Sequence, residues 1–574
     1  DGVAYYQLTH DYLVPAIERW ISRRQHETRR GRAELRLSEY ASTWSVKPKR
    51  KFEPSWIDWV TIRLLSSPDR WSATERRMMR SATRNHLVRS VGILATLMIL
   101  SMVGWGIWKR SRAVATVQQL QTVRTGELSE VLHQIRDHGS YATPELKQSF
   151  AAAEPNSREQ TLNQLGLLQT EEGPREWLIP QSLDLDLPLL TMVRDQLGTL
   201  SQKELEWLTE ALRDQGQSAE RRLRAAIMLS GQVADGDSPE FALSDEESEM
   251  IVTEMLRHAT ISPHDNSHLI SGFRPISDAL KVPLLTRALE RNDSPIRSLS
   301  TAFTIQLFRD KPSVLLDFFL DASFDQHPTI LSTLGIKLPN LSDQIRKTVS
   351  SEIDPDLSES EFDKQARRRG VATALLHRLN QPESTWPLFR KKKWPHTRGY
   401  LINRIGPLGG DFSVLLSRFA RETDPAVRRA LMLTMGGFDW SELSKTAQSE
   451  GLLLAKDTFR NEPDVGTHSA AQWLLMQWNE TKWLKEEISL QSGLARDPRK
   501  SWFINGEGQT MAILDGRQDP EIGRVFAIGT GEVTVEQFQR FDPEHEYHEE
   551  RSPTPDCPVG LVDWIRAARY CGWL

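Results

Sequence analysis

The sequence predicts a mainly α-helical chain with one membrane-spanning helix and a smaller C-terminal part that combines strands with helices. Three observations predict this class. Residues 90–108 form an unbroken uncharged segment, and residues 109–490 are dominated by helical spacing of apolar residues. Residues 500–574 combine short apolar alternations with clustered glycines, as strands and tight turns do. The expected fold is therefore α, followed by a small α/β part.

Length and composition are those of a multidomain globular protein. The chain has 574 residues, of which 39% are hydrophobic and 26% charged. It begins at Asp1 without a methionine and ends at Leu574 inside a helical pattern, so we expect a piece of a longer protein. Changes in composition predict five parts, at residues 1–45, 46–89, 90–108, 109–490 and 500–574.

The N-terminal part is basic. Residues 1–89 contain 18 Lys and Arg against 10 Asp and Glu, a net charge of +8, and residues 17–44 have the pattern of one long helix. This arginine density suits either nucleic acid or anionic lipid, whereas the alternative is a solvated helix that leads to a membrane anchor. Glu27, Glu34 and Glu39 interrupt the basic stripe and favour the solvated helix, so no nucleic-acid partner is expected.

The strongest physical signal is the segment SVGILATLMILSMVGWGIW at residues 90–108. Its 19 uncharged residues match the length that a helix needs to cross a hydrocarbon core, and Trp105 and Trp108 suit an interfacial aromatic belt. The alternative, a buried core helix, would normally carry a polar stripe. The segment is internal, which argues against a cleaved signal peptide.

Basic residues on the two flanks predict the orientation of this helix. Six arginines precede the segment within 20 residues, and four basic residues follow it. These are Arg70, Arg76, Arg77, Arg80, Arg84 and Arg89 before it, and Lys109, Arg110, Arg112 and Arg124 after it. The positive-inside bias therefore predicts a single-pass protein whose N-terminal side is cytoplasmic and whose acidic C-terminal side is exported.

Residues 109–490 contain three related segments, which start near residues 293, 423 and 461. Each places a proline near a helix start and then small and large apolar residues at helical spacing. The pattern resembles HEAT-type repeats, in which pairs of helices stack into a solenoid; one unrepeated helical domain is the alternative. Either form offers surface for protein partners. The basic stretch FRKKKWPHTR at residues 389–398 is interpreted as a solvated loop.

Residues 500–574 are expected to form strands, then a short helix, then a second helix. Thr534 and Gln537 have the spacing of a capping box, and Val535, Phe538 and Phe541 form one inward face. The last helix places an apolar face on residues 564, 567, 568 and 571, and the sequence provides no later segment to cover it.

Candidate reactive and metal-binding residues are few. Cys557 and Cys571 are the only two cysteines, and no base or metal that would activate either thiol is predictable from sequence; a disulfide between them is one alternative. His545, His548 and Cys557 have zinc-ligand chemistry, but the surrounding acidic residues favour a solvated loop. We therefore assign no catalytic residue and no metal site.

The segment around Leu8-Thr9-His10-Asp11 resembles the end of the ATPase region in the STAND class of signal-transduction ATPases. The basic segments up to residue 89 are similar to the region that follows that ATPase in planctomycete-type membrane proteins, which often begin with a Ser/Thr kinase. The resemblance implies that His10 senses bound ATP or ADP in a larger protein. The sequence has neither a phosphate-loop motif nor the kinase motifs, so this chain is not expected to bind ATP in the usual way.

The last 75 residues or so resemble the start of the formylglycine-generating enzyme (sulfatase-modifying factor) domain, whose fold is related to C-type lectins. The resemblance is carried by Glu532, Val533, Thr534, Phe538, Pro558, Val559, Val562, Trp564, Ala567, Tyr570, Cys571, Trp573 and Leu574. It implies that the catalytic cysteine pair, the copper site and the calcium sites of a complete domain lie beyond Leu574.

Together these resemblances imply a membrane-anchored signalling or scaffold protein with an exported sulfatase-modifying-factor-like domain. Two alternatives remain open. One is an oxidase that converts a sulfatase cysteine to formylglycine, and the other is a ligand-binding module on the same fold.

Overall fold

The computed structural model describes residues 19–20, 23, 28–170, 175–232, 242–292 and 294–574. The chain is mainly helical, as predicted, and divides into two compact units, Asp1–Leu185 and Asp186–Leu574. The boundary between the units falls inside the expected helical part at residues 109–490. Each unit is described by itself.

From residue 28 onward, the described part of the first unit starts with a cluster of three helices and two 3-10 turns. These are α2 (Arg29–Val46), η2 (Arg50–Phe52), α3 (Trp56–Leu65), η3 (Pro68–Arg70) and α4 (Ala73–Thr122). Hydroxyl side chains begin each helix: Thr28 accepts a hydrogen bond from the Gly31 amide, Ser55 from the Asp58 amide, and Ser72 forms a capping box with Glu75.

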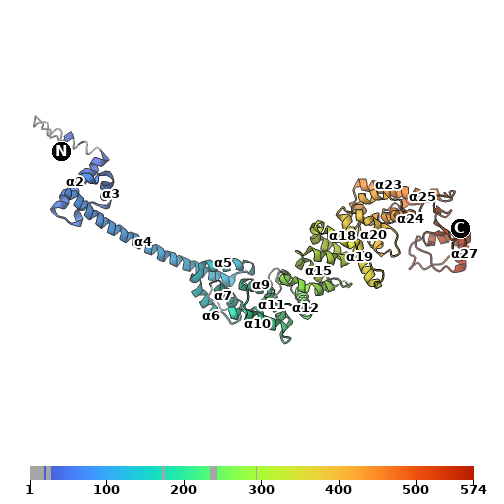
Figure 1. The fold of residues 1–574 in the computed structure, drawn as a ribbon, viewed down its shortest axis with the longest axis horizontal. Helices are drawn as coiled ribbons and strands as arrows, with labels where there is room; N and C mark the ends of the chain where they lie inside the picture. The colour runs from blue at the N-terminus through green and yellow to red at the C-terminus, as the bar shows by residue number, and fades with distance from the viewer. Residues whose placement is uncertain (1–18, 21–22, 24–27, 171–174, 233–241, 293) are drawn as a thin grey trace. The chain divides into compact units, whose positions relative to one another are not determined.

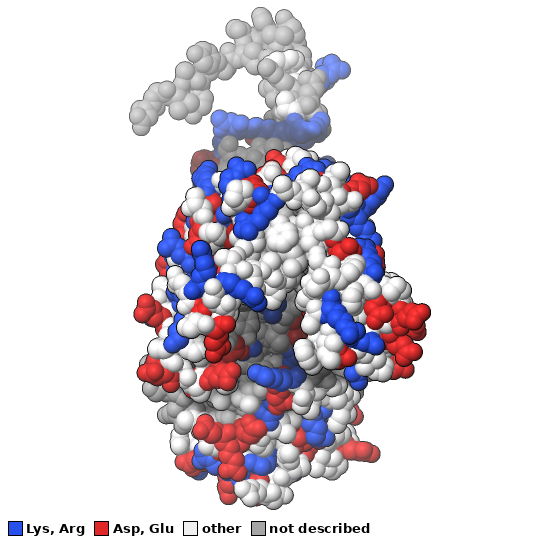
Figure 2. All heavy atoms as spheres, turned by 90° about the vertical axis from the view of Figure 1, so that its right-hand side faces the viewer, with Lys and Arg blue, Asp and Glu red and all other residues white. Residues whose placement is uncertain are grey.

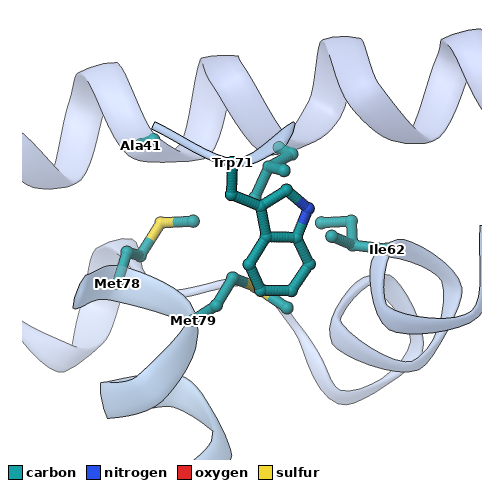
Figure 3. Packing of buried hydrophobic residues seen from close by; sticks show 6 residues of the cluster. Ala41, Ile62, Trp71, Met78 and Met79 are labelled. Atoms are coloured by element: carbon teal, nitrogen blue, oxygen red, sulfur yellow. The ribbon is translucent and has the colours of Figure 1, made fainter. Parts of the chain in front are cut away.

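The three helices enclose a small hydrophobic core, which Figure 3 shows in close-up. Trp71, from the connection between α3 and α4, lies among Ile62, Met78 and Met79, and α2 adds Leu37 and Ala41. The indole Nε1 of Trp71 donates to the Ser66 hydroxyl at 2.9 Å, so its one polar atom is satisfied. This core joins residues on both sides of the boundary expected at residues 45 and 46.

The prediction of one long helix over residues 17–44 is wrong at Thr28. This residue is extended, with φ −96° and ψ 144°, and its side chain caps a new helix at Arg29. An N-cap residue takes non-helical backbone angles, so a helix cannot run through it. Residues 22–27 contain no apolar residue, so no apolar face carries a helical period up to Thr28.

The last part of the first unit packs on the C-terminal end of α4. Its elements are η4 (Thr125–Glu127), α5 (Leu128–His138), η5 (Gly139–Tyr141), α6 (Thr143–Ala152), α7 (Arg158–Gln169) and α8 (Arg175–Ser182). Helices α5, α6 and α7 all contact α4. Figure 1 shows α4 as one continuous helix.

The second unit consists of an array of helices followed by a small sheet. The helices and turns of the array are α9 (Leu187–Leu197), α10 (Gln202–Arg213), α11 (Ala219–Ser230), α12 (Asp245–Ile261), η6 (Pro263–Asp265), α13 (Asn266–Phe273), η7 (Arg274–Ile276), α14 (Ser277–Ala288), α15 (Pro295–Leu307), α16 (Pro312–Asp321), η8 (Phe324–Gln326), α17 (His327–Leu334), η9 (Gly335–Leu341), α18 (Ser342–Ser350), α19 (Glu359–Arg378), η10 (Glu383–Phe389), α20 (His396–Arg404), α21 (Phe412–Arg421), α22 (Pro425–Met435), η11 (Trp440–Glu442), α23 (Lys445–Asn461), α24 (Val465–Gln477) and α25 (Thr481–Gln491).

Helices of the array contact their neighbours in sequence and also the helix after next. For example, α22 contacts α20, α21 and α24. A proline lies next to a helix start in each of the three related segments, as predicted; in two of them Pro295 and Pro425 begin α15 and α22 behind the caps Ser294 and Asp424. In the third, Asp464 caps α24 directly after Pro463. Whether these helices form HEAT-type repeats stays a prediction.

The C-terminal part contains the expected strands and helices. The strands β1 (Trp502–Ile504), β2 (Thr510–Asp515) and β3 (Val525–Gly529) form an antiparallel sheet in the order β1-β2-β3. Helices α26 (Val535–Phe541) and α27 (Trp564–Trp573) follow. The capping box of Thr534 and Gln537 is confirmed.

The predicted apolar face of α27, on residues 564, 567, 568 and 571, is exposed, in line with the expectation that no segment of this chain covers it. Trp564 is 79% exposed and Cys571 is exposed as well, whereas Tyr570, outside that face, is the buried residue of the helix. The Tyr570 ring stacks on Phe538, and its hydroxyl accepts a hydrogen bond from Gln509 at 2.6 Å. Aromatic contacts with α26 therefore orient α27.

Candidate functional site

The central part of α4 is an apolar helix surface without protein cover. Among the described residues α4 is the one helix long and apolar enough to cross a membrane, and none of its apolar window is buried. Leu94, Leu97 and Leu100 are 57–65% exposed. Residues 90–108 would extend about 28 Å as a helix, close to the thickness of a hydrocarbon core. An uncovered apolar surface of this length is unfavourable in water.

Polar contacts fix the segment before α3 against α4 directly in front of this surface. The Glu53 carboxylate accepts hydrogen bonds from Ser81 at 2.7 Å and from Asn85 at 2.8 Å. His86 Nε2 donates to the Pro54 carbonyl at 3.0 Å, because a carbonyl oxygen can only accept. Residues 53–54 and 81–86 therefore form one connected wall.

Aromatic and basic side chains surround the other end of the apolar surface. The rings of Trp105 and Trp108 lie 5.4 Å apart, and the Arg112 guanidinium lies 4.4 Å from the Trp108 ring. Lys109 Nζ lies 5.8 Å from the Trp105 ring and 5.7 Å from the Tyr141 ring. Tryptophan, tyrosine and flanking cations are enriched at the boundary between hydrocarbon and headgroups.

Beyond this boundary α4 is covered by protein again. Ala113, Val117 and Leu120 are fully buried against the following helices, and Thr116 is nearly so. Helix α4 thus packs into one hydrophobic core near its N-terminal end and into a second core near its C-terminal end, and its apolar middle is uncovered. Such a helix can hold two folded parts at its two ends.

A second site of interest is a cationic pocket in the array, between α19 and the segment before α20. Its volume is about 420 Å³, and its lining includes five basic residues and the single acid Glu352. The basic residues are Arg369, Arg390, Lys392, Lys393 and Arg398. The predicted loop FRKKKWPHTR thus lines a pocket, with Trp394 5.9 Å from the Phe362 ring.

Burial lowers the pKa of two arginines in this cationic pocket. For Arg398 the causes are desolvation and then the nearby charge of Arg429, and for Arg369 desolvation dominates. Arg369 donates to the Val349 carbonyl at 2.7 Å, whereas Arg398 makes no hydrogen bond or ion pair to a described residue. Cations held this way favour an incoming anion. On the face drawn in Figure 2, basic and acidic side chains are interspersed.

The residues singled out from sequence fall in different places. His10 lies outside the described residues. Cys557 and Cys571 are both free thiols; Cys571 is exposed, and Cys557 Sγ lies 3.1 Å from the Thr554 hydroxyl. In the described part of the chain, no three His, Cys, Asp or Glu side chains are grouped so that they could hold a metal.

The interpretation of His545 as a residue of a solvated loop is wrong. His545 is buried, at 4% exposure, and its ring packs edge-on against Phe538 with centroids 4.6 Å apart. Its Nε2 donates to the Gly560 carbonyl at 2.9 Å, and its Nδ1 accepts from Arg566 at 2.9 Å. Both ring nitrogens of His545 are hydrogen-bonded, and the bond from Arg566 connects the loop to α27. The acidic sequence around His545 did not indicate these contacts.

Comparison of the chain with protein-family models, with curated proteins and with solved structures found no match.

Sequence reasoning located the apolar segment but missed the polar wall beside it. The wall depends on pairs far apart in the chain, such as Glu53 with Asn85, which no local pattern links. One usable signal was present: Lys47, Lys49, Arg50 and Lys51 form a basic cluster, and six arginines lie within the 20 residues before residue 90. Two basic stretches on the same side of an apolar helix indicate a charged surface there.

Proposed function

We propose that this chain is a membrane-anchored scaffold whose single membrane-spanning helix is residues 90–108 of α4. The observation that carries the proposal is the uncovered apolar surface of α4 between two protein cores. A lipid bilayer is the environment in which that surface is stable. The basic N-terminal helices would lie in the cytoplasm, and the array and residues 500–574 would be exported.

The test compares the same substitution at two exposed leucines, one in α4 and one in the array. Leu97→Arg places a charge at the centre of the proposed span, whereas Leu453→Arg changes a leucine of similar exposure on α23, 57% against 68%. We expect Leu97→Arg to cost about 3 kcal/mol of insertion free energy and to reduce the fraction of chain that resists alkaline extraction from membranes. Leu453→Arg should leave that fraction unchanged, and equal behaviour of both variants would contradict the proposal.

Reporter fusions test the orientation separately. A fusion after residue 85 should report the cytoplasm, and a fusion after residue 120 should report the exported side. Both fusions in one compartment would exclude a single span, whereas an exchange of compartments would exclude only the orientation.

The array is proposed as the part that binds protein partners, with the cationic pocket as the place where an acidic segment docks. Lys392→Gln with Lys393→Gln should weaken binding of a glutamate-rich peptide by about tenfold, because two charges near a desolvated anion are lost. The matched control is Arg291→Gln with Lys347→Gln, two exposed cations of the array outside the pocket. Equal loss with both variants would indicate diffuse attraction only.

For residues 500–574 the proposal keeps the likeness to the formylglycine-generating enzyme domain, without catalysis by this chain. The alternative, oxidation of a sulfatase cysteine, is tested by incubating the chain with copper and a sulfatase-derived cysteine peptide. We expect no aldehyde product, and its formation would favour the oxidase. The nucleotide-sensing role of His10, with ATP or ADP bound to an ATPase region outside this chain, is likewise a proposal.

A further inference from the structure

A pocket lies where the N-terminal helix cluster meets the proposed membrane span. Its volume is about 610 Å³, and it lies between residues 50–56 and residues 85–94 of α4. One end of the lining is polar, with Arg50, Asn85, His86 and Arg89. The other end is apolar and consists of Ile93 and Leu94, with Trp56 in the opposite wall.

The two walls of this juxtamembrane pocket are fixed to each other by contacts within the cluster. Glu53 accepts hydrogen bonds from Ser81 and Asn85 of α4, and His86 of α4 donates to the Pro54 carbonyl, so residues 53–54 cannot shift along α4 or away from it without breaking these bonds. The Trp59 indole also donates to Thr83 at 3.0 Å one turn earlier. The pocket is thus preformed, which lowers the entropic cost of binding a ligand.

Basic side chains outnumber acidic ones in the lining of the juxtamembrane pocket. Neither the Arg50 nor the Arg89 side chain makes a hydrogen bond or ion pair to any described residue, and both are exposed. Glu53 is the one acid of the lining, and its two oxygens already accept hydrogen bonds from Ser81 and Asn85. Two guanidinium groups therefore remain available for an anion such as a phosphate.

The position of the pocket along α4 indicates which class of anion it would bind. Arg89 immediately precedes residue 90, where the uncharged segment begins, and Ile93 and Leu94 lie one turn further into it at 61% and 65% exposure. Trp56, 57% exposed, lines the same pocket, and tryptophan is favoured at the boundary between headgroups and hydrocarbon. The two arginines are expected at the depth of the lipid headgroups, and the apolar residues follow toward the hydrocarbon. A phospholipid has its phosphate and its acyl chain in the same sequence along the membrane normal, so it suits this pocket.

We infer that this pocket binds an anionic phospholipid of the leaflet on the N-terminal side. Arg50 and Arg89 hold the phosphate, Asn85 and the Ser55 hydroxyl border the headgroup, and the first part of an acyl chain lies along Ile93 and Leu94. The inference rests on the proposed membrane span. It adds a specific lipid site to a segment that would otherwise serve only as an anchor.

The experiment uses the full chain in nanodiscs of phosphatidylcholine with a minor fraction of phosphatidylglycerol. Native mass spectrometry counts the lipids of each kind that stay bound after release. We expect phosphatidylglycerol to be enriched on the chain, and Arg50→Gln with Arg89→Gln to reduce that enrichment by about tenfold, because two phosphate contacts are lost.

The matched control is Lys47→Gln with Arg84→Gln. It removes two exposed cations from the same side of the membrane, neither of which lines the pocket. An equal loss of enrichment in both double variants would overturn the pocket and leave only diffuse attraction to an anionic surface. Unchanged enrichment in both would overturn it as well.

Two further arms separate the possible causes of failure. Displacement of phosphatidylglycerol by millimolar inorganic phosphate would indicate a general anion site and overturn the lipid assignment. Incorporation into discs of phosphatidylcholine alone tests the span by itself. If the chain inserts into these discs but shows no preference for phosphatidylglycerol in the mixed discs, only the lipid site is refuted. If the chain does not insert, the proposed function is refuted.

Discussion

The imidazole of His468 in α24 stacks on the indole of Trp502 in β1, with ring centroids 3.5 Å apart and an interplanar angle of 21°. On its other face the imidazole stacks on Phe459 of α23, and its Nδ1 donates to the Phe459 carbonyl at 2.7 Å. The Trp502 Nε1 donates to the Glu462 carbonyl at 2.7 Å. Residues from two helices and one strand thus join the array to the C-terminal sheet.

Trp502→Ala should weaken this joint, by which we mean the contacts of His468, Phe459 and Glu462 with Trp502. The side chain is 2% exposed, so its removal creates a cavity and is expected to lower the free energy of unfolding by about 3 to 5 kcal/mol. Urea unfolding measures the loss, and limited proteolysis should show faster cleavage between residues 491 and 502. Trp394→Ala, at a tryptophan that is 50% exposed, is the control and should change unfolding far less. Equal effects of the two substitutions would contradict a structural role for the joint.

Buried histidines should make the array sensitive to acid. Burial is the main cause that lowers the pKa of His327, His377 and His468 from 6.5 to about 4. Because the unfolded chain binds these protons between pH 6.5 and 4 and the folded chain does not, stability is full above pH 6.5 and falls as the pH drops. Each histidine should cost about 2 kcal/mol at pH 5.

Urea unfolding at pH 7 and at pH 5 measures this dependence. His468→Gln should remove about a third of it, since one of three such groups is lost. His264→Gln, at a side chain that is 80% exposed, serves as the control. An unfolding free energy that stays constant between the two pH values would refute the argument.

The pair of Arg428 and Glu462 should contribute more than an exposed pair. Arg428 Nη2 lies 2.7 Å from Glu462 Oε2, and the two side chains are 20% and 8% exposed. We expect Glu462→Gln to lower the free energy of unfolding by about 2 kcal/mol, because the partly buried guanidinium of Arg428 loses its counter-charge. Glu536→Gln breaks the exposed pair with Arg540 and should cost less than about 0.5 kcal/mol. The prediction fails if urea unfolding gives similar values for both.

Asp58 should stabilise the N-terminal cluster as a carboxylate. It accepts hydrogen bonds from Ser55 at 2.7 Å and Tyr40 at 3.0 Å and pairs with Arg36 at 2.7 Å. The Ser55 hydrogen bond is the main cause that lowers its pKa, and the bonds to Tyr40 and Arg36 act in the same direction. Its stabilisation is therefore present at neutral pH and lost as the pH falls below about 4.

Hydrogen exchange of the α2 and α3 amides measures this contribution locally. Asp58→Ala should reduce protection in both helices by about 2 kcal/mol at pH 7, with a smaller effect near pH 3. Asp69→Ala, at an exposed carboxylate, is the control. Unchanged protection in α2 after Asp58→Ala would show that the two helices do not depend on this residue.

Features with a local signal were predictable. The uncharged run at residues 90–108 indicated an uncovered helix, Pro295 and Pro425 marked helix starts, and the spacing of Thr534 and Gln537 indicated a capping box. In each case the physical cause acts within one or two helical turns, so neighbouring residues suffice to indicate it.

Features that join distant parts of the chain were not predictable. Acidic neighbours suggested that His545 is solvated, yet contacts with Phe538, Gly560 and Arg566 bury it. Helical spacing could not say that Tyr570, rather than Trp564, would be the buried residue of α27. Such outcomes depend on which surfaces the fold brings together.

Hydropathy and helix periodicity are properties of adjacent residues, so they already indicated a mainly helical chain with one segment suited to a membrane. The hydrogen bonds of Glu53 with Asn85 and of His86 with Pro54, and with them the preformed cationic pocket beside that segment, became visible only in the folded chain. Hydrogen bonds between residues 32 positions apart form only after α3 has packed against α4, and no local pattern encodes that packing.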